Sequence, residues 1–84
     1  MTLVEIYSKR DCHLCDIAKE VVQEVKQSYS FELREILIQE GDEQYEQFKE
    51  RIPVLFVNGK FAFQYRVNKQ EFIKRLQEES VSVV

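Results

Sequence analysis

The stretch YSKRDCHLCDIAKEVV (residues 7–22) decides how this chain is interpreted. It holds both cysteines of the chain, Cys12 and Cys15, with two residues between them. Before it lies the run TLVEIY (residues 2–7), which is short, apolar and typical of a buried strand. After it begins an amphipathic pattern, with apolar residues at positions 14, 17, 18, 21, 22 and 25. The cysteines are therefore predicted to lie where a strand gives way to a helix that ends near Ser28.

A second strand and a second, shorter helix follow in the pattern. FELREILI (residues 31–38) has the apolar content of a strand. The chain then breaks at Gly41, and Asp42 is a plausible N-cap for a helix. Three residues at helical spacing form its apolar side: Tyr45, Phe48 and Ile52. Pro53 must end this helix, because the residue before a proline is disfavoured in helical angles.

The next segment, PVLFVNGKFAFQY (residues 53–65), predicts a β-hairpin. Its two apolar strands flank Asn58-Gly59, which is a strong signal for a two-residue turn. Three aromatic residues alternate along the second strand, and we expect them to serve packing rather than a substrate groove: Phe61, Phe63 and Tyr65.

The C-terminal part of the chain predicts a last helix. Asn68 and Glu71 resemble a capping box, with Asn in place of Ser or Thr. The residues expected to face inward are Phe72, Ile73 and Leu76. SVSVV (residues 80–84) fits either a frayed tail or a short β-prone segment. The whole order is β-α-β-α-β-β-α, an α/β fold in which the first two strands are parallel and the last two antiparallel.

Length and composition limit the function. Eighty-four residues suffice for one small domain, residues 1–84. A net charge of −3 gives no electrostatic footprint for nucleic acid and no basic face for an anionic membrane. No apolar run approaches the roughly 20 residues of a membrane span. MTLVEIYSK is too short and too acidic for a signal peptide, so we expect a cytoplasmic protein, where disulfides are mostly transient and catalytic.

The spacing of the cysteines favours redox chemistry. In a helix that begins near Cys12, both sulfur atoms lie on one face of the first turn, near the positive end of the helix dipole. That position, with Lys9 and Arg10 just upstream, is expected to lower the pKa of the Cys12 thiol, although Asp11 and Asp16 act against it. Cys15 should be more buried. Cys12 is thus the expected nucleophile, and Cys15 the thiol that resolves the mixed disulfide.

Three other interpretations of the pair stay open. A structural disulfide closing only four residues would stabilise the fold by only about 2 kcal/mol. A metal site could use Cys12, His13 and Cys15, but structural zinc normally takes four ligands. The chain has no second cysteine pair and no other histidine, so a second subunit or an external thiol would have to complete the site. The two cysteines could also be incidental buried residues.

Two polar neighbours of the pair have both a functional and a structural interpretation. His13 could stabilise the thiolate or relay a proton, but adjacent residues do not face each other on a helix, so a solvated loop histidine fits as well. Lys9 could support the thiolate or be only a solvated charge.

These motifs resemble those of the glutaredoxin family. The segment from Tyr7 to Cys15 is similar to the glutaredoxin active-site segment, which has a lysine three residues before the first cysteine. Arg51-Ile52-Pro53-Val54 resembles the Thr-Val-Pro loop, and the residues 56–60 resemble the hairpin turn that follows it. The Cys-His-Leu-Cys variant is most similar to small bacterial glutaredoxin-like proteins. The resemblance covers nearly the whole chain.

The resemblance implies a thioredoxin-like fold, with a four-stranded mixed sheet flanked by helices, and thiol–disulfide oxidoreductase activity. It implies that Lys9 supports the thiolate or a substrate carboxylate. Arg51 and Ile52 would offer backbone groups to an extended substrate segment, and Pro53, with a cis peptide bond, would hold that loop opposite the dithiol. It implies no cofactor beyond the Cys12–Cys15 disulfide, with glutathione or another thiol as reductant.

The chain departs from glutaredoxins after the hairpin. The Gly-Gly pair that holds glutathione is replaced by Phe63-Gln64, and Val67-Asn68 stands near the position of the family's aspartate. The expected partners are a disulfide-containing protein or low-molecular-weight thiol and a reductant thiol or reductase, acting on a monomer. The alternative is a non-enzymatic thioredoxin-fold module that binds a metal or protein partner through the Cys-His-x-Cys cluster.

Overall fold

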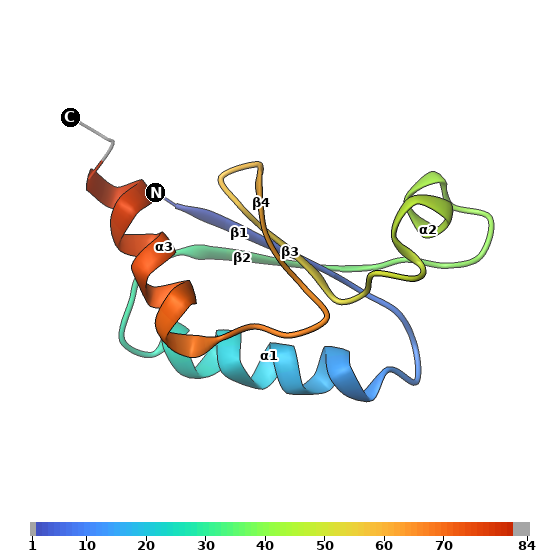
Figure 1. Cartoon of the computed structure of the whole chain (residues 1–84), viewed down its shortest axis with the longest axis horizontal. Coiled ribbons are helices and arrows are strands. Elements are labelled where there is room, and N and C mark those ends of the chain that lie inside the picture. The colour runs from blue at the N-terminus through green and yellow to red at the C-terminus, as the bar shows by residue number, and fades with distance from the viewer. Residues whose placement is uncertain (1, 82–84) are drawn as a thin grey trace.

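The computed structural model describes residues 2–81 (Figure 1). Its elements are β1 (Leu3–Ser8), α1 (His13–Lys26), β2 (Glu32–Leu37), α2 (Glu43–Phe48), β3 (Val54–Val57), β4 (Lys60–Gln64) and α3 (Lys69–Val81). The strands form one sheet in the order β2-β1-β3-β4. β1 pairs with β2 in parallel, and the other two pairings are antiparallel. The predicted element order, the mixed sheet and both strand directions are confirmed.

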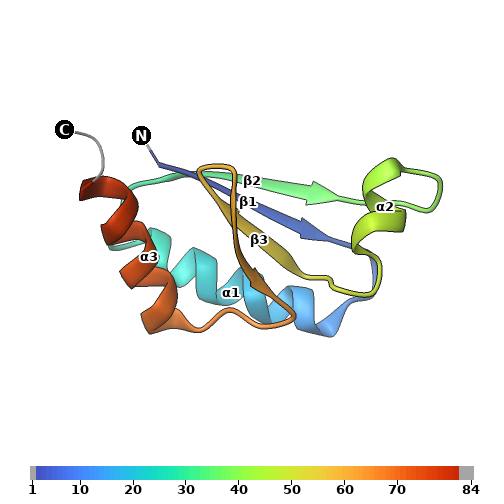
Figure 2. The same ribbon diagram turned by 45° about the horizontal axis from the view of Figure 1, so that its top comes forward.

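The main core lies between the sheet and the two longer helices. Figure 2 shows α1 and α3 on the same side of the sheet. Because side chains alternate along a strand, Val4 and Ile6 of β1 both point to this side, and both are fully buried. They meet Val22 of α1 and Phe72 of α3, also fully buried. No helix among residues 2–81 is long and apolar enough to cross a membrane.

Helix α1 buries a narrower face than its sequence pattern predicts. Its buried residues are Cys15, Ala18, Val22 and Val25. Ile17, predicted to lie on the apolar stripe, is 43% exposed. The apolar stripe is wider than the part of the helix that the sheet covers, and the helix is rotated so that Cys15 rather than Ile17 faces inward. Cys15 therefore belongs to the core of the protein.

A second, smaller core lies near the end of the sheet where α2 is placed (Figure 1). We call it the dithiol-side core, and its buried members are Cys15, Ile38, Phe48, Ile52 and Val54. The predicted extent of α2 was wrong, because the helix ends at Phe48 and the chain turns through residues 49–51 before Ile52. Ile52 nevertheless packs in the same core as Phe48.

Two predicted helix caps have different outcomes. Asn68 caps α3 as predicted, since its Oδ1 accepts a hydrogen bond from the backbone N–H of Glu71 at 3.0 Å. Asp42 is the N-cap residue of α2, but its side chain makes no cap hydrogen bond. Its carboxylate instead accepts from the N–H of Gln39 at 2.9 Å and closes the turn before the helix. Of the SVSVV segment, residues 80 and 81 end α3 and the rest lies outside the described residues.

The hairpin turn is built as its sequence predicts. Asn58 and Gly59 both have positive φ, 50° and 78°, as a type I′ turn requires. The Asn58 side chain also ties the turn to the rest of the fold. Its Oδ1 accepts from the N–H of Leu3 at 2.8 Å, and its Nδ2 donates to the carboxylate of Glu79, which is only 7% exposed.

A bulge in β4 overturns the expected alternation of its aromatic residues. Phe61 pairs with Phe56 and Phe63 pairs with Leu55, with a register shift between them, so Ala62 is the extra residue of the bulge. Phe63 therefore meets Phe72 in the main core, while Phe61 meets Phe56 on the other face. Phe61 is 43% exposed, and its packing role is only partial.

Replacing Asn58 tests the turn. Asn58→Ala is expected to lower the free energy of unfolding by about 1–2 kcal/mol, because alanine tolerates positive φ poorly and loses the bond to Leu3. Urea unfolding at 25 °C measures this change. Asn58→Gly, which keeps the backbone freedom and loses only the side-chain bonds, should cost less. Equal losses in both variants would show that the backbone conformation of Asn58 contributes nothing.

Candidate active site

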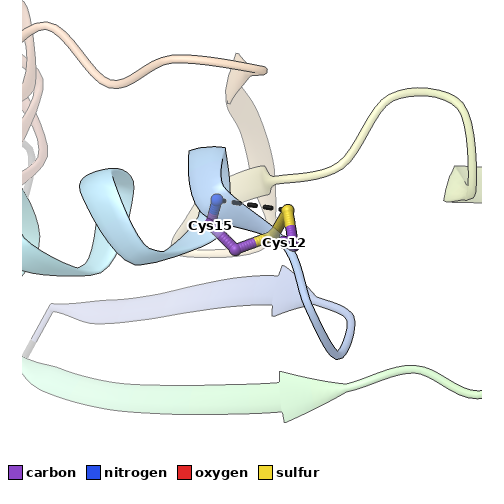
Figure 3. Close-up of a disulfide and its surroundings, with 2 residues drawn as sticks. All are labelled: Cys12 and Cys15. Carbon is purple, nitrogen blue, oxygen red and sulfur yellow. Dashed lines mark hydrogen bonds between the residues drawn. A yellow bond between two sulfur atoms is a disulfide. The ribbon is translucent and has the colours of Figure 1, made fainter.

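The two cysteines form a disulfide at the first turn of α1 (Figure 3). Cys12 is the N-cap of the helix, with extended backbone angles, and its Sγ accepts a hydrogen bond from the backbone N–H of Cys15 at 3.2 Å. The two Cα atoms are 5.2 Å apart. Asp11 brings the chain into the helix with φ of 54°, a conformation that aspartate tolerates better than most residues. The sulfur of Cys12 thus takes the position that a capping oxygen has in other helices.

The two sulfur atoms have different environments. Cys15 is 1% exposed and belongs to the dithiol-side core. Cys12 is half-buried and packs against that core from outside. The expectation that Cys15 is the more buried of the pair is confirmed. A group approaching from solvent therefore reaches Cys12 before Cys15.

The residues around Pro53, 49–54, which we call the proline segment, meet the dithiol in the dithiol-side core. Ile52 and Val54, on either side of Pro53, are buried in the cluster that contains Cys15. The Ile52–Pro53 peptide bond is cis, and Pro53 is buried. Arg51 is exposed. The structure therefore brings together residues about 40 positions apart in the sequence.

The charged candidates that flank Cys12 in the sequence are exposed. Lys9 and Arg10 are exposed and line a cavity of about 320 Å³, together with Ile38, Gln39, Glu40 and Tyr45. His13 is the first residue of α1 and is exposed. The cavity is therefore formed by the loop that leads from β1 into the dithiol and by the loop that follows β2. Its lining combines the two cations Lys9 and Arg10 with the carboxylate of Glu40.

Two further cations lie at the start of the proline segment. The Lys49 ammonium is 3.0 Å from the Glu46 carboxylate, and the hydrogen bond and charge of Glu46 raise the pKa of this lysine. The Arg51 guanidinium lies 5.8 Å from the ring centroids of both Phe48 and Phe61. Lys49 is thus paired with Glu46, and Arg51 is held between two rings.

The end of β4 also contacts the proline segment, which the sequence did not indicate. Arg51 Nε donates to Gln64 Oε1 at 3.0 Å, and Tyr65 Oη donates to the backbone oxygen of Glu50 at 2.8 Å. The N–H of Tyr65 donates to the oxygen of Pro53, also at 2.8 Å. The pattern of alternating aromatics suggested packing alone, and nothing in it signalled these polar contacts.

A metal site made by one copy of the chain has no support in the geometry. Among residues 2–81, no three histidine, cysteine, aspartate or glutamate side chains lie close enough together to hold a metal ion. Cys12 and Cys15 are joined to each other instead. What the arrangement can do chemically is cycle between a dithiol and a disulfide.

The fold and this site define a class of protein. A parallel β-α-β unit followed by an antiparallel hairpin and a helix, with a disulfide at the start of the first helix, is a thioredoxin-like arrangement. Solved structures agree. Protein XcR50 from X. campestris has 20% identity and a TM-score of 0.74, covering 89% of this chain and 96% of its own. Protein Ne2328 from Nitrosomonas europaea has 22% identity and a TM-score of 0.74, covering 88% and 89%.

Thioredoxin-2 of a malaria parasite is also similar, with 12% identity, a TM-score of 0.63 and coverage of 93% of this chain and 82% of its own. At these identities the likeness shows the fold. The family is shown by a separate comparison, in which the model of the glutaredoxin-like domain matches residues 3–81. The chain belongs to the glutaredoxin-like domain family. Its thioredoxin-like fold and its Cys12–Cys15 pair support a redox role.

The cap geometry predicts the reactivity of the reduced protein. In Cys15→Ser, where Cys12 is the only thiol, the rate of alkylation by iodoacetamide should rise with a midpoint below the usual thiol pKa of about 8.5, because the helix terminus stabilises the thiolate. In Cys12→Ser, the buried Cys15 should react more slowly and titrate higher. A midpoint for Cys12 at or above the usual value would contradict the prediction.

Proposed function

We propose that this protein is a thiol–disulfide oxidoreductase that acts by dithiol exchange. The observation that carries the proposal is the asymmetry of the Cys12–Cys15 pair at the start of α1, with one sulfur accessible and capped and the other buried beside the proline segment. A structural staple needs no such asymmetry. The electron-transport role that we propose for the protein follows from the same chemistry, because two electrons pass through the Cys12–Cys15 pair in each cycle.

In the reductive direction, the thiolate of Cys12 attacks one sulfur of the substrate disulfide. A bond forms between Cys12 Sγ and that sulfur, the substrate S–S bond breaks, and the leaving sulfur takes up a proton. Cys15, as thiolate, then attacks Cys12 Sγ and releases the second substrate thiol. The substrate has gained two electrons and two protons, and the protein is left with the Cys12–Cys15 disulfide. A thiol reductant, glutathione or another, or a reductase restores the dithiol.

The surrounding residues have proposed roles in binding. Lys9, which lines the cavity between the loop after β1 and the loop after β2, supports the Cys12 thiolate or a carboxylate of the substrate. His13 stabilises the same thiolate from the first helical position. Arg51 and Ile52 offer their backbone to an extended substrate segment, and Pro53 holds that loop against the dithiol-side core. No cofactor is required beyond the redox-active disulfide.

The proposed substrates are a disulfide-containing protein or a low-molecular-weight thiol in disulfide form. The protein would act as a monomer in the cytoplasm, where a dithiol can stay reduced between turnovers. The partial exposure of Cys12 in the single chain supports exchange by a monomer.

Substitution of each cysteine separates the two roles. Cys12→Ser should abolish exchange, whereas Cys15→Ser should accumulate a mixed disulfide at Cys12, because the resolving thiol is gone. Intact-protein mass after incubation with insulin or oxidised glutathione, quenched with acid, detects the adduct. The double variant is the control. Equal loss of reactivity in both single variants, with no adduct, would reject the proposed mechanism.

Equilibrium titration of the pair in glutathione buffers tests the redox couple itself. A reversible two-electron transition within roughly −270 to −120 mV is expected, the range of working oxidoreductases. Thiol alkylation followed by mass measurement gives the oxidised fraction. If no disulfide forms under oxidising buffer, or if the thiols react only after a chelator is added, the pair is not a redox couple.

A further inference from the structure

The proline segment is held from two sides, and only one side is the dithiol-side core. Ile52 and Val54 anchor it from within that core. On the other side, Gln64 and Tyr65 at the end of β4 make three hydrogen bonds to residues 50–53, with lengths of 3.0, 2.8 and 2.8 Å. Two of the three are made to backbone oxygens, those of Glu50 and Pro53. These contacts fix the path of the backbone rather than only a side chain.

The β4 bulge makes the contact with Arg51 possible. In a regular strand, residues three apart point to opposite faces, so Phe61 and Gln64 would lie on different sides of the sheet. The extra residue Ala62 places Phe61 opposite Phe56 and Gln64 opposite Val54, which are on one face. Both side chains therefore reach Arg51, one through its ring at 5.8 Å and one through its amide oxygen at 3.0 Å.

Tyr65 adopts a backbone conformation that is unfavourable for its side chain. Its φ is 67°, in the left-handed region that tyrosine rarely occupies. Such strained residues cluster at functional sites and persist only where surrounding contacts determine them. Here the backbone N–H of Tyr65 donates to the backbone oxygen of Pro53, and its hydroxyl donates to the backbone oxygen of Glu50. The backbone and the side chain of Tyr65 therefore both bind the proline segment.

We infer that Gln64 and Tyr65 are positioning residues that hold the proline segment in the conformation that binds an extended substrate. The inference rests on the proposed function, in which the backbone of Arg51 and Ile52 contacts a polypeptide substrate. A protein disulfide needs that segment in place. A small disulfide that contacts only Cys12 does not, and this difference makes the role measurable.

The test compares two probes with pre-reduced protein in single-turnover reactions. Insulin is the polypeptide probe and hydroxyethyl disulfide the small one. For Tyr65→Phe, which keeps the ring and removes the hydroxyl, the half-saturating insulin concentration should rise about two- to tenfold, as for one neutral hydrogen bond. The maximal rate with insulin should change less than twofold, and so should the rate with hydroxyethyl disulfide. Gln64→Leu should show the same difference between the two probes, because it removes the hydrogen bond from Arg51.

Tyr29→Phe is the matched control, because Tyr29 packs against the main core and its loss of a hydroxyl should leave both probes unaffected. If Tyr65→Phe and Gln64→Leu both match wild type with insulin, the positioning role is overturned while the proposed function stands. A parallel loss with both probes, accompanied by a fall in melting temperature, also overturns it, since it indicates a purely structural role. If wild type reduces neither probe, the proposed function fails first.

Discussion

The start of α1 at Cys12 is the constraint on which the site depends. Because the helix begins there, the backbone N–H of Cys15 donates to the Cys12 sulfur. The side chain of Cys15 is buried. The left-handed turn at Asp11 fixes that start, since it ends the extended backbone of β1 and leads directly into the cap. Local backbone geometry thus places the Cys12 sulfur at the start of the helix, and the packing of α1 on the sheet buries Cys15.

Burial of Cys15 in turn connects the dithiol to the rest of the sheet. The dithiol-side core contains residues from α1, the end of β2, α2 and the start of β3. Phe48 of this core packs with Phe56 and Tyr7 at its border, with ring centroids 5.0–6.0 Å apart. This core is separate from the one between the sheet and the two longer helices. The disulfide therefore lies over a packed cluster of its own, apart from the main core.

Sequence reasoning reached the elements but not all of their details. Some features follow from short stretches of sequence. These are the order of helices and strands, the hairpin turn at Asn58-Gly59 and the cap at Asn68, and the structure contains each of them. The pairing of Pro53 with the cysteines came from resemblance, because contacts between distant positions leave no local pattern. The rotation of α1 that buries Cys15 and exposes Ile17 depends on which part of the stripe the sheet covers. An apolar stripe predicts which face of a helix is buried, but not which residues within the stripe the sheet covers.

The bulge at Ala62 is a second feature that the sequence pattern does not predict. The letters KFAFQY alternate as an ordinary strand would, and the insertion of one residue into the pairing is invisible in them. Yet that insertion decides which face each aromatic residue and Gln64 occupy. Local sequence patterns therefore predict where the dithiol lies. The register shift in β4, which they do not predict, decides which residues contact the proline segment. In this protein the position where the local pattern and the observed register disagree is also the one that brings β4 into contact with Arg51.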